Sequence, residues 1–316
     1  MIRSFLRDTD LTPAEAAEVF EMAHRYKKIR SAGNLDILRG QSWGLVFFKK
    51  STRTRLSFEA GIYELGGHPM VMNADDLQIS RGETIEDTAK IFGRFLHGVV
   101  IRTFEQQMID DFAKYSGLPV VNALTDLLHP CQSYTDIFTM IEKFGGAGAS
   151  PDCVKGRKFV FFGDTACNMA YSLALAGSMF GVNVVLCGPE EFRPSPELDA
   201  LFDSAGLQKN YTFTSDPEAA AKDADVFYTD VWVSMGKEAE KAERIKTMSP
   251  YQVNEKLMSL GSKDSIFMHC LPAHSGEEVT EGVLRSPKCI VFDQAENRLH
   301  IQKAIVSWLV QKNRQV

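Results

Sequence analysis

The sequence has no long apolar run and no closely spaced pair of cysteines. No part of its 316 residues approaches the ~18 consecutive apolar residues that a membrane-spanning helix needs. The start, MIRSFLRDTDL, is broken by charges, so we expect no secretory signal. The six cysteines form no CxxC pair, and together with the seven histidines they show no zinc-type spacing. These absences disfavour a membrane protein or a disulfide scaffold and predict a cytoplasmic protein with reduced thiols and no metal.

The chain also lacks a basic excess and a dinucleotide-binding fingerprint. It has 35 Lys and Arg against 41 Asp and Glu, a formal charge of −6, which argues against nucleic acid or an anionic membrane as the main partner. An anionic substrate would therefore have to be bound by a local cluster of cations. The turn GDTACN follows an apolar run but has none of the later glycines of GxGxxG. We therefore disfavour a nicotinamide enzyme and expect no cofactor.

Short apolar runs alternate with helical patterns along the whole chain. A length of 316 residues is too great for one ordinary core and fits two domains of roughly 100–200 residues each. Continuous apolar strands are typical of parallel sheets that are covered on both faces. The sequence therefore predicts two doubly wound parallel-sheet α/β domains, with the active site in the cleft between them. The predicted strands lie at 43–48, 70–72, 99–101, 120–121, 159–162, 182–186, 226–228, 266–269 and 290–292.

Helix signals and one small-residue stretch suggest the domain limits. Thr12 can cap a first helix, with Pro13 in its first position and Glu15 completing a capping box. The stretch GGAGASPD ends a long helical pattern at 133–144 and is the strongest boundary signal. We predict domains at 1–145 and 151–296, with a last helix over 297–316 that packs back on the first domain. Further helical patterns lie at 55–65, 84–96, 107–115 and 169–180.

The strongest single motif is KSTRTR, at residues 50–55. It follows an apolar strand and opens a helix, whose free N–H groups and positive end favour an anion. Ser51, Thr52 and Thr54 add hydroxyl donors. Arg53 adds a planar guanidinium that fits phosphate oxygens. The motif predicts a phosphate site, although an ordinary capped helix with surface arginines is an equal alternative when it is taken alone.

Four more residues could surround such an anion. Arg102 ends the apolar strand GVVIR, where a side chain points to the ligand edge of a parallel sheet. His129 and Gln132, in HPCQ before a long helix, could both donate hydrogen bonds to a polarised carbonyl oxygen. Arg298 stands at the start of the last predicted helix, where a cation is otherwise unfavourable. A structural histidine and solvated arginines remain the alternatives.

The second half of the chain also has polar residues after its strands. Asn168 opens a helix and could bind a carboxylate, and Asp230 follows a strand and could hold a substrate ammonium group. Ser234 and Met235 belong to a Gly-containing segment whose backbone could approach a ligand. Cys270 could be a nucleophile, but the sequence shows no paired base, and a buried thiol is the commoner case.

Together these motifs resemble the carbamoyltransferases in order and spacing, over nearly the whole chain. The matching segments are STRTR, IRTF, HPCQ, the turn GDTACN, DVWVSMG, HCLPAH and DQAENRLH. STRTR and HPxQ occur across the superfamily and imply carbamoyl phosphate, whereas SMG and HCLP resemble the ornithine branch. The resemblance implies transfer of a carbamoyl group to the side-chain amine of L-ornithine, giving L-citrulline and phosphate in arginine metabolism. Another amine (putrescine or an acylated ornithine) and an inactive regulatory paralogue are the alternatives. Lys50 departs from the family, which usually has Pro there.

The resemblance also implies the roles of individual residues. Gln78 matches a residue that the family inserts into a neighbouring subunit's site, which implies a homotrimer or an assembly of trimers. Catalysis would rest on Arg102, His129, Gln132, Asp230 and Cys270. Carbamoyl phosphate would contact Ser51, Thr52, Arg53, Thr54, Gln78, Arg102, His129, Gln132 and Arg298, and ornithine would contact Asn168, Asp230, Ser234, Met235, Cys270 and Leu271.

Overall fold

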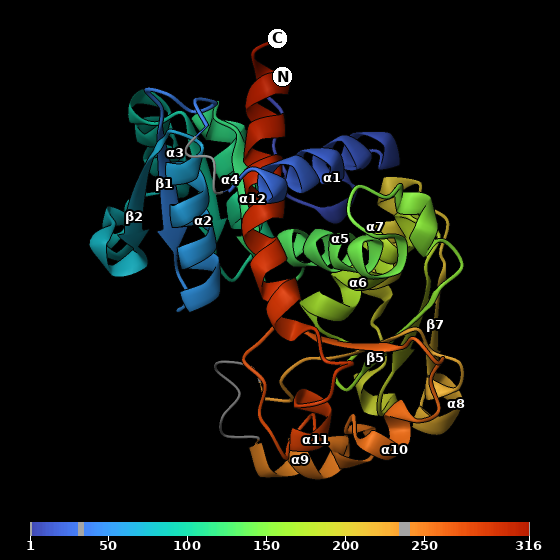
Figure 1. Ribbon diagram of the computed structural model, residues 1–316. Coiled ribbons are helices and arrows are strands. Elements are labelled where there is room, and N and C mark those ends of the chain that lie inside the picture. The colour runs from blue at the N-terminus through green and yellow to red at the C-terminus, as the bar shows by residue number, and fades with distance from the viewer. Residues whose placement is uncertain (1, 31–34, 234–240, 316) are drawn as a thin grey trace. The chain divides into compact units, whose positions relative to one another are not determined.

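The structure is a computed structural model that describes residues 2–30, 35–233 and 241–315 (Figure 1). It divides into two compact units, one made of Met1–Phe138 with Glu296–Val316 and the other of Thr139–Ala295. Each unit contains one sheet, and every strand pairing in both sheets is parallel. The predicted class, two parallel-sheet α/β domains, is confirmed. The predicted cleft between the domains stays a prediction.

The sheet of the first unit has the strand order β2-β1-β3-β4. Its strands are β1 (Ser42–Phe47), β2 (His68–Asn73), β3 (Gly98–Arg102) and β4 (Val120–Leu124). The chain runs from β1 to one side and then returns to the other, so the boundary between β1 and β3 is the topological switch point. In open parallel sheets, ligands bind beyond the carboxyl ends of the strands at this point.

An apolar cluster covers one face of this sheet. It is supplied by α3 (Ile85–Phe95) and α4 (Gln106–Ser116), which pack on buried residues of β1, β3 and β4. Phe92 and Phe112 meet edge to face, with ring centroids 5.3 Å apart. The spacing of apolar residues in α3 and α4 gives each helix one buried stripe, which is why they lie flat on the sheet.

Two helices from opposite ends of the sequence pack closely in this unit. They are α2 (Thr52–Glu64) and α12 (Val291–Asn313). A Cβ atom at Gly61 would lie 3.1 Å from the Cγ atom of Lys303, so the absence of a side chain permits this approach. The Nζ atom of Lys303, whose side chain is 3% exposed, donates to the Oε2 atom of Glu64 at 2.7 Å. The contact brings the middle of α12 beside the helix that opens with the STRTR motif.

The first unit is completed by α1 (Pro13–Lys28) and the start of α5 (Pro130–Gly145). The predicted capping box of α1 is present: the Glu15 backbone N–H donates to the Thr12 hydroxyl at 3.3 Å, and the Thr12 N–H donates to the Glu15 carboxylate at 2.9 Å. No helix in the described ranges is both long and apolar enough to span a membrane.

The sheet of the second unit has the strand order β7-β6-β5-β8-β9. The strands are β5 (Lys158–Phe162), β6 (Asn183–Cys187), β7 (Tyr211–Thr214), β8 (Val226–Thr229) and β9 (Ile266–His269). Here the strand order reverses between β5 and β8. The segments that follow these two strands, GDTACN and DVW, therefore lie at the position where a ligand is expected.

Helices cover both faces of this second sheet. Figure 1 shows α6 (Asn168–Met179) on one side and α8, α10 and α11 on the other. The latter three share an apolar core with β5, β8 and β9. The remaining bounds are α7 Pro196–Ala205, α8 Pro217–Ala221, α9 Lys241–Met248, α10 Glu255–Met258 and α11 Glu281–Leu284.

Every predicted strand except the last overlaps an observed strand, and β7 was not predicted. The strand predicted at 290–292 is wrong, because α12 begins at Val291 and the Gln294 N–H already donates to the Ile290 carbonyl at 2.9 Å. Three apolar residues in a row do not distinguish a strand from a buried helical turn. Arg298 consequently lies well inside α12. The interpretation that it is an unfavourable cation at a helix start is therefore wrong.

Candidate active site

The STRTR motif forms the turn and first helical turn after β1. Ser51 is the N-cap of α2, and its side chain makes no capping hydrogen bond. The first turn of α2 contains no acidic residue, so its N–H groups and positive helix end are not offset locally. Thr52 is exposed and Arg53 is partly exposed. This arrangement can bind an anion such as a phosphate.

Thr54 and Arg298 are joined by a buried hydrogen bond. Their side chains are 1% and 4% exposed, and a guanidinium N–H of Arg298 donates to the Thr54 hydroxyl oxygen at 2.6 Å. Because that oxygen accepts, the hydroxyl proton of Thr54 can be donated in another direction. The pairing places a cation from α12 next to the first turn of α2.

Arg102 and His129 add further donors at the same edge of the sheet. The register of β1 and β3 pairs Phe47 with Arg102, and the Phe48 N–H donates to the Arg102 carbonyl at 2.8 Å. His129 precedes α5 and is 4% exposed. Burial, followed by the positive charges of Arg298 and Arg102, holds the pKa of His129 well below its usual range. The imidazole is therefore neutral near pH 7 and donates through a single N–H.

Gln132 lies in the first turn of α5 and is 1% exposed. Its amide nitrogen donates to the Oδ1 atom of Asp136 at 2.8 Å. The amide oxygen is buried and has no hydrogen-bond partner among the described residues. The Gln132 amide oxygen can therefore accept a hydrogen bond from a ligand. The sequence had predicted that Gln132 would donate one.

Gln78 is exposed at the start of a 3-10 helix, Gln78–Arg81. Within the described parts of the chain, the Gln78 side chain makes no hydrogen bond to the STRTR motif at residues 51–55. Lys50 is also exposed. Its neighbour Lys49 forms an ion pair with Asp126 and lies 4.3 Å from the ring centroid of Phe104.

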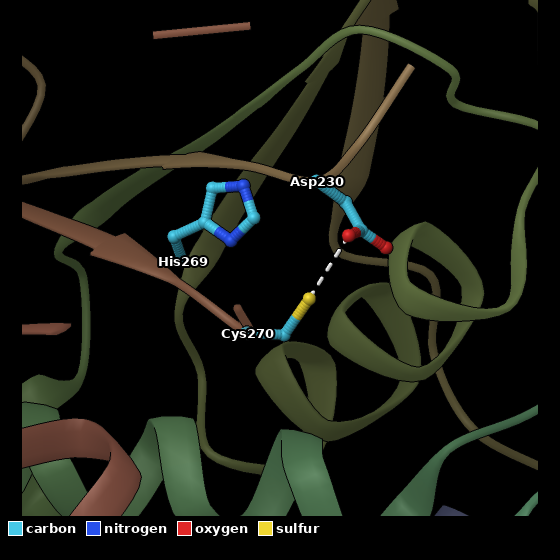
Figure 2. Close-up of side chains that lie close together, drawn as sticks. All are labelled: Asp230, His269 and Cys270. Atoms are coloured by element: carbon cyan, nitrogen blue, oxygen red, sulfur yellow. Dashed lines mark hydrogen bonds between the residues drawn. The ribbon is translucent and has the colours of Figure 1, made fainter. Parts of the chain in front are cut away.

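In the second unit, Asp230 and Cys270 meet at the ends of adjacent strands (Figure 2). The register of β8 and β9 pairs Thr229 with His269, so the next residue of each strand lies beside the other. The Cys270 thiol donates to the Oδ1 atom of Asp230 at 3.0 Å. The same carboxylate oxygen accepts from the Val231 N–H at 2.7 Å. The acidic group is therefore held in place by two donors.

A buried histidine holds the segment that follows Cys270. The Nδ1 atom of His269 accepts a hydrogen bond from the Leu271 N–H at 2.8 Å, so its proton is on Nε2. That Nε2 atom lies 3.3 Å from the Oε1 atom of Glu278, and both side chains are fully buried. Leu271 has φ +59°, a left-handed conformation that is strained for a side chain with a Cβ atom. The His269 contact fixes this conformation of the Cys270–Leu271 segment.

Asp230, His269 and Cys270 could in principle hold a metal ion, since their potential ligand atoms lie within 4.8 Å of one another. The nitrogen and sulfur atoms already take part in the hydrogen bonds described above. A metal would have to displace those bonds and the Leu271 conformation that depends on them. We propose no metal here, and the predicted absence of a metal site stays a prediction.

Asn168 is the first residue of α6, after β5, and is partly buried. Nearby in the same unit, the Nε atom of Arg244 donates to the Trp232 carbonyl at 2.8 Å, and Arg244 forms a buried ion pair with Asp164. This contact fixes the DVW segment. The predicted ligands Ser234 and Met235 lie outside the described residues.

The sequence did not reveal three side chains that hold Gln132, His269 and Trp232 in place. Asp136 follows Gln132 by four residues, and the i,i+4 rule for helices could have revealed that pair. Glu278 contacts His269, and Arg244 contacts Trp232, but irregular segments separate the two members of each pair in the sequence. No periodic pattern therefore relates them. For these two the sequence contains no comparable local signal.

Comparisons with known proteins agree on one family. The family model described as the carbamoyl-P binding domain of aspartate/ornithine carbamoyltransferase matches residues 3–142, and that of the Asp/Orn binding domain matches residues 155–309. A protein of Thermococcus kodakarensis named ornithine carbamoyltransferase is 44% identical, with 97% of this chain and 94% of that protein covered. One of Acidothermus cellulolyticus with the same name is 45% identical, with coverages of 98% and 97%.

Solved structures give the same result. The ornithine carbamoyltransferase of Pyrococcus furiosus has a TM-score of 0.88 and 43% identity, with 96% of each chain covered. An anabolic ornithine carbamoyltransferase of Campylobacter jejuni has a TM-score of 0.89 and 34% identity, with 98% of this chain and 100% of that chain covered. The similarity therefore extends over both units.

Proposed function

The chain belongs to the aspartate/ornithine carbamoyltransferase family, and on that basis we propose which of its residues carry out the reaction. It transfers the carbamoyl group of carbamoyl phosphate to the side-chain amine of L-ornithine, which gives L-citrulline and phosphate. The observation that supports this most directly is 44% and 45% identity to ornithine carbamoyltransferases along almost the whole chain. Transfer to another amine and an inactive paralogue are not favoured.

Carbamoyl phosphate is bound by the first unit. The first turn of α2 holds the phosphate with Ser51, Thr52 and Arg53, and Arg53 improves phosphate as a leaving group. Arg102, His129 and the Thr54 hydroxyl donate to the carbonyl oxygen as negative charge develops on it. Arg298 supports this group through its hydrogen bond with Thr54. We assign this role to the domain predicted at 1–145, together with residues 297–316.

Ornithine is bound by the second unit, in the domain predicted at 151–296. Asp230 holds the α-ammonium group and Asn168 the α-carboxylate, and we assign Ser234 and Met235 to the same ligand. Cys270 and Leu271 contact the side of ornithine that carries the reacting amine. Two donors fix the Asp230 carboxylate, and the Leu271 backbone is fixed by His269, so both are in place before ornithine binds.

The reaction is a direct attack without a covalent enzyme intermediate. The neutral side-chain amine adds to the carbonyl carbon, the C–O bond to phosphate breaks, and the departing phosphate takes up the proton that the amine loses. An alkylammonium group has a pKa near 10, so the site must select the neutral form. Cys270 donates its thiol proton to Asp230, and we assign this hydrogen bond to holding the Asp230 carboxylate in place and not to activating a nucleophile.

The protein is a homotrimer, or an assembly of trimers, in the cytoplasm, and Gln78 reaches a neighbouring subunit's site. Gln78 is exposed in this chain, which agrees with a role outside its own subunit. All six cysteines are described and none forms a disulfide, which agrees with a reducing compartment. Large apolar side chains that could be covered by neighbouring subunits are exposed on α2, β2 and α3: Leu56, Tyr63, Met70, Ile91 and Phe95.

The first experiment measures product formation from carbamoyl phosphate with ornithine, putrescine, N-acetylornithine and aspartate. We expect kcat/KM for ornithine to exceed that for each other amine by on the order of 1,000-fold. Asp230 and Asn168 hold α-groups of which putrescine lacks both and N-acetylornithine blocks one, and aspartate has no side-chain amine to receive the carbamoyl group. Faster turnover of another amine would contradict the ornithine assignment and leave the carbamoyl phosphate site standing. No turnover with any amine would support an inactive paralogue.

The role of Arg53 is tested by Arg53→Ala, with Arg55→Ala as the matched control. Arg55 lies in the same helix but is exposed and paired with Glu59 at 3.5 Å. Loss of the phosphate contact should lower kcat/KM by on the order of 1,000-fold, since the interaction strengthens in the transition state. Arg55→Ala should stay within about threefold of the wild type. Equal effects of the two changes would remove Arg53 from the phosphate site.

Cys270→Ala tests the thiol. We expect the KM for ornithine to rise roughly tenfold while kcat falls by less than that, because one binding contact is lost. Cys270→Ser keeps a donor to Asp230 and should lie between the wild type and the alanine variant. Isolation of a carbamoylated Cys270 by mass spectrometry during turnover would overturn the direct mechanism.

Subunit sharing is tested by co-expressing Arg53→Ala with Gln78→Ala. If Gln78 acts in a neighbouring subunit, random mixed trimers contain intact sites at about a quarter of positions, so activity returns although each variant alone is nearly inactive. If Gln78 serves its own subunit, every site carries one defect and the mixture stays inactive. Sedimentation of the mixed protein checks that trimers have formed.

A further inference from the structure

The pair Gln132–Asp136 fixes the orientation of an amide in the carbamoyl phosphate site. Asp136 lies one helical turn after Gln132 in α5, and the two side chains are 0% and 1% exposed, respectively. The amide nitrogen of Gln132 donates to the Oδ1 atom of Asp136 at 2.8 Å. A carboxylate oxygen accepts hydrogen bonds and cannot donate them. The nitrogen must therefore face Asp136, and the amide oxygen must face away from it.

The amide oxygen of Gln132 lacks a hydrogen-bond donor: it is buried and accepts no hydrogen bond from any residue that the structure describes. Buried acceptors in native proteins are nearly always paired, so a donor from a ligand is expected here. The backbone N–H of Gln132 donates to the His129 carbonyl at 2.9 Å, which places this amide one turn from the carbonyl-binding histidine.

The other side chains of this site are hydrogen-bond donors, whereas the Gln132 oxygen is an acceptor. Arg102 and Arg298 only donate, and neutral His129 donates through a single N–H. Such donors suit a carbonyl oxygen. A carbamoyl group carries a carbonyl oxygen and an NH₂ group side by side, whereas an acetyl group of nearly the same size carries a methyl group in place of the NH₂.

We propose that Asp136 is a specificity-determining positioning residue: it holds the Gln132 oxygen toward the ligand, so that the site requires an N–H donor and rejects acyl phosphates that lack one. This rests on the proposed binding of carbamoyl phosphate. Asp136 acts through Gln132 and does not touch the substrate. Without Asp136 the amide could turn over and present its nitrogen instead.

The test is Asp136→Asn, measured with three ligands. The quantities are the Kd for carbamoyl phosphate and the inhibition constants of acetyl phosphate and inorganic phosphate. Asparagine has the same shape but can donate as well as accept, so either orientation of Gln132 becomes possible. We expect selectivity for carbamoyl phosphate over acetyl phosphate to fall roughly tenfold while binding of inorganic phosphate is unchanged.

A matched control and a rescue separate this role from a structural one. Asp8→Asn changes another fully buried carboxylate of the same unit, which accepts from Ser133, and should leave selectivity unchanged. The double variant Gln132→Glu with Asp136→Asn restores the polarity, because the new amide donates to the new carboxylate, whose other oxygen faces the ligand. Selectivity should return toward that of the wild type, even if Asp136→Asn alone folds poorly.

The outcomes distinguish the possible failures. Equal weakening of all three ligands in Asp136→Asn, with no rescue, would show that Asp136 only supports the fold. Unchanged selectivity in a folded Asp136→Asn protein would overturn the inference and leave the proposed function intact. A wild-type protein that does not distinguish carbamoyl phosphate from acetyl phosphate would also overturn the inference, whereas a wild-type protein that forms no citrulline from carbamoyl phosphate and ornithine would contradict the proposed function itself.

Discussion

Parallel strands end at the same edge of a sheet, and this constraint brings the polar residues of each unit together. In the first unit it places the turn after β1 beside Arg102 at the end of β3. In the second it places Asp230 beside Cys270, because Thr229 and His269 are partners in the register. Both groups lie at or next to a point where the strand order reverses. The loops can then vary in length without moving the side chains that begin them.

Side chains of opposite charge follow the strands in the two units. The first contributes Arg53, Arg102 and Arg298, and burial together with the charges of Arg298 and Arg102 lowers the pKa of His129 and keeps it neutral. The site therefore offers donors to an anion and to a carbonyl oxygen. The second unit presents the Asp230 carboxylate, which suits an ammonium group. A chain with a net charge of −6 thus binds an anionic substrate through local arrangement and not through its overall field.

The sequence predicted the features that depend on neighbours along the chain. The apolar runs gave nearly all strands, and the Thr12–Glu15 pair gave the start of α1. The residues that follow the strands gave the candidate ligands, because a parallel sheet fixes which edge they occupy. Contacts between distant segments were not predictable: Thr54 and Arg298 are 244 positions apart, and His269 meets Glu278 through a loop without a repeating pattern. The orientation of the Gln132 amide needed the structure, although its spacing from Asp136 pointed to the pair.

The hydrogen bond between Arg298 and Thr54 also has a meaning for biosynthesis. A ribosome adds about 5–20 residues per second, so Thr54 emerges on the order of 10 s or more before Arg298 has been added. During that interval α2 has neither the guanidinium nor the close packing of α12 at Gly61. The emerging first domain is therefore exposed to chaperones and proteases with its ligand-binding turn incomplete. The contacts with α12 can form only when nearly the whole chain has been made.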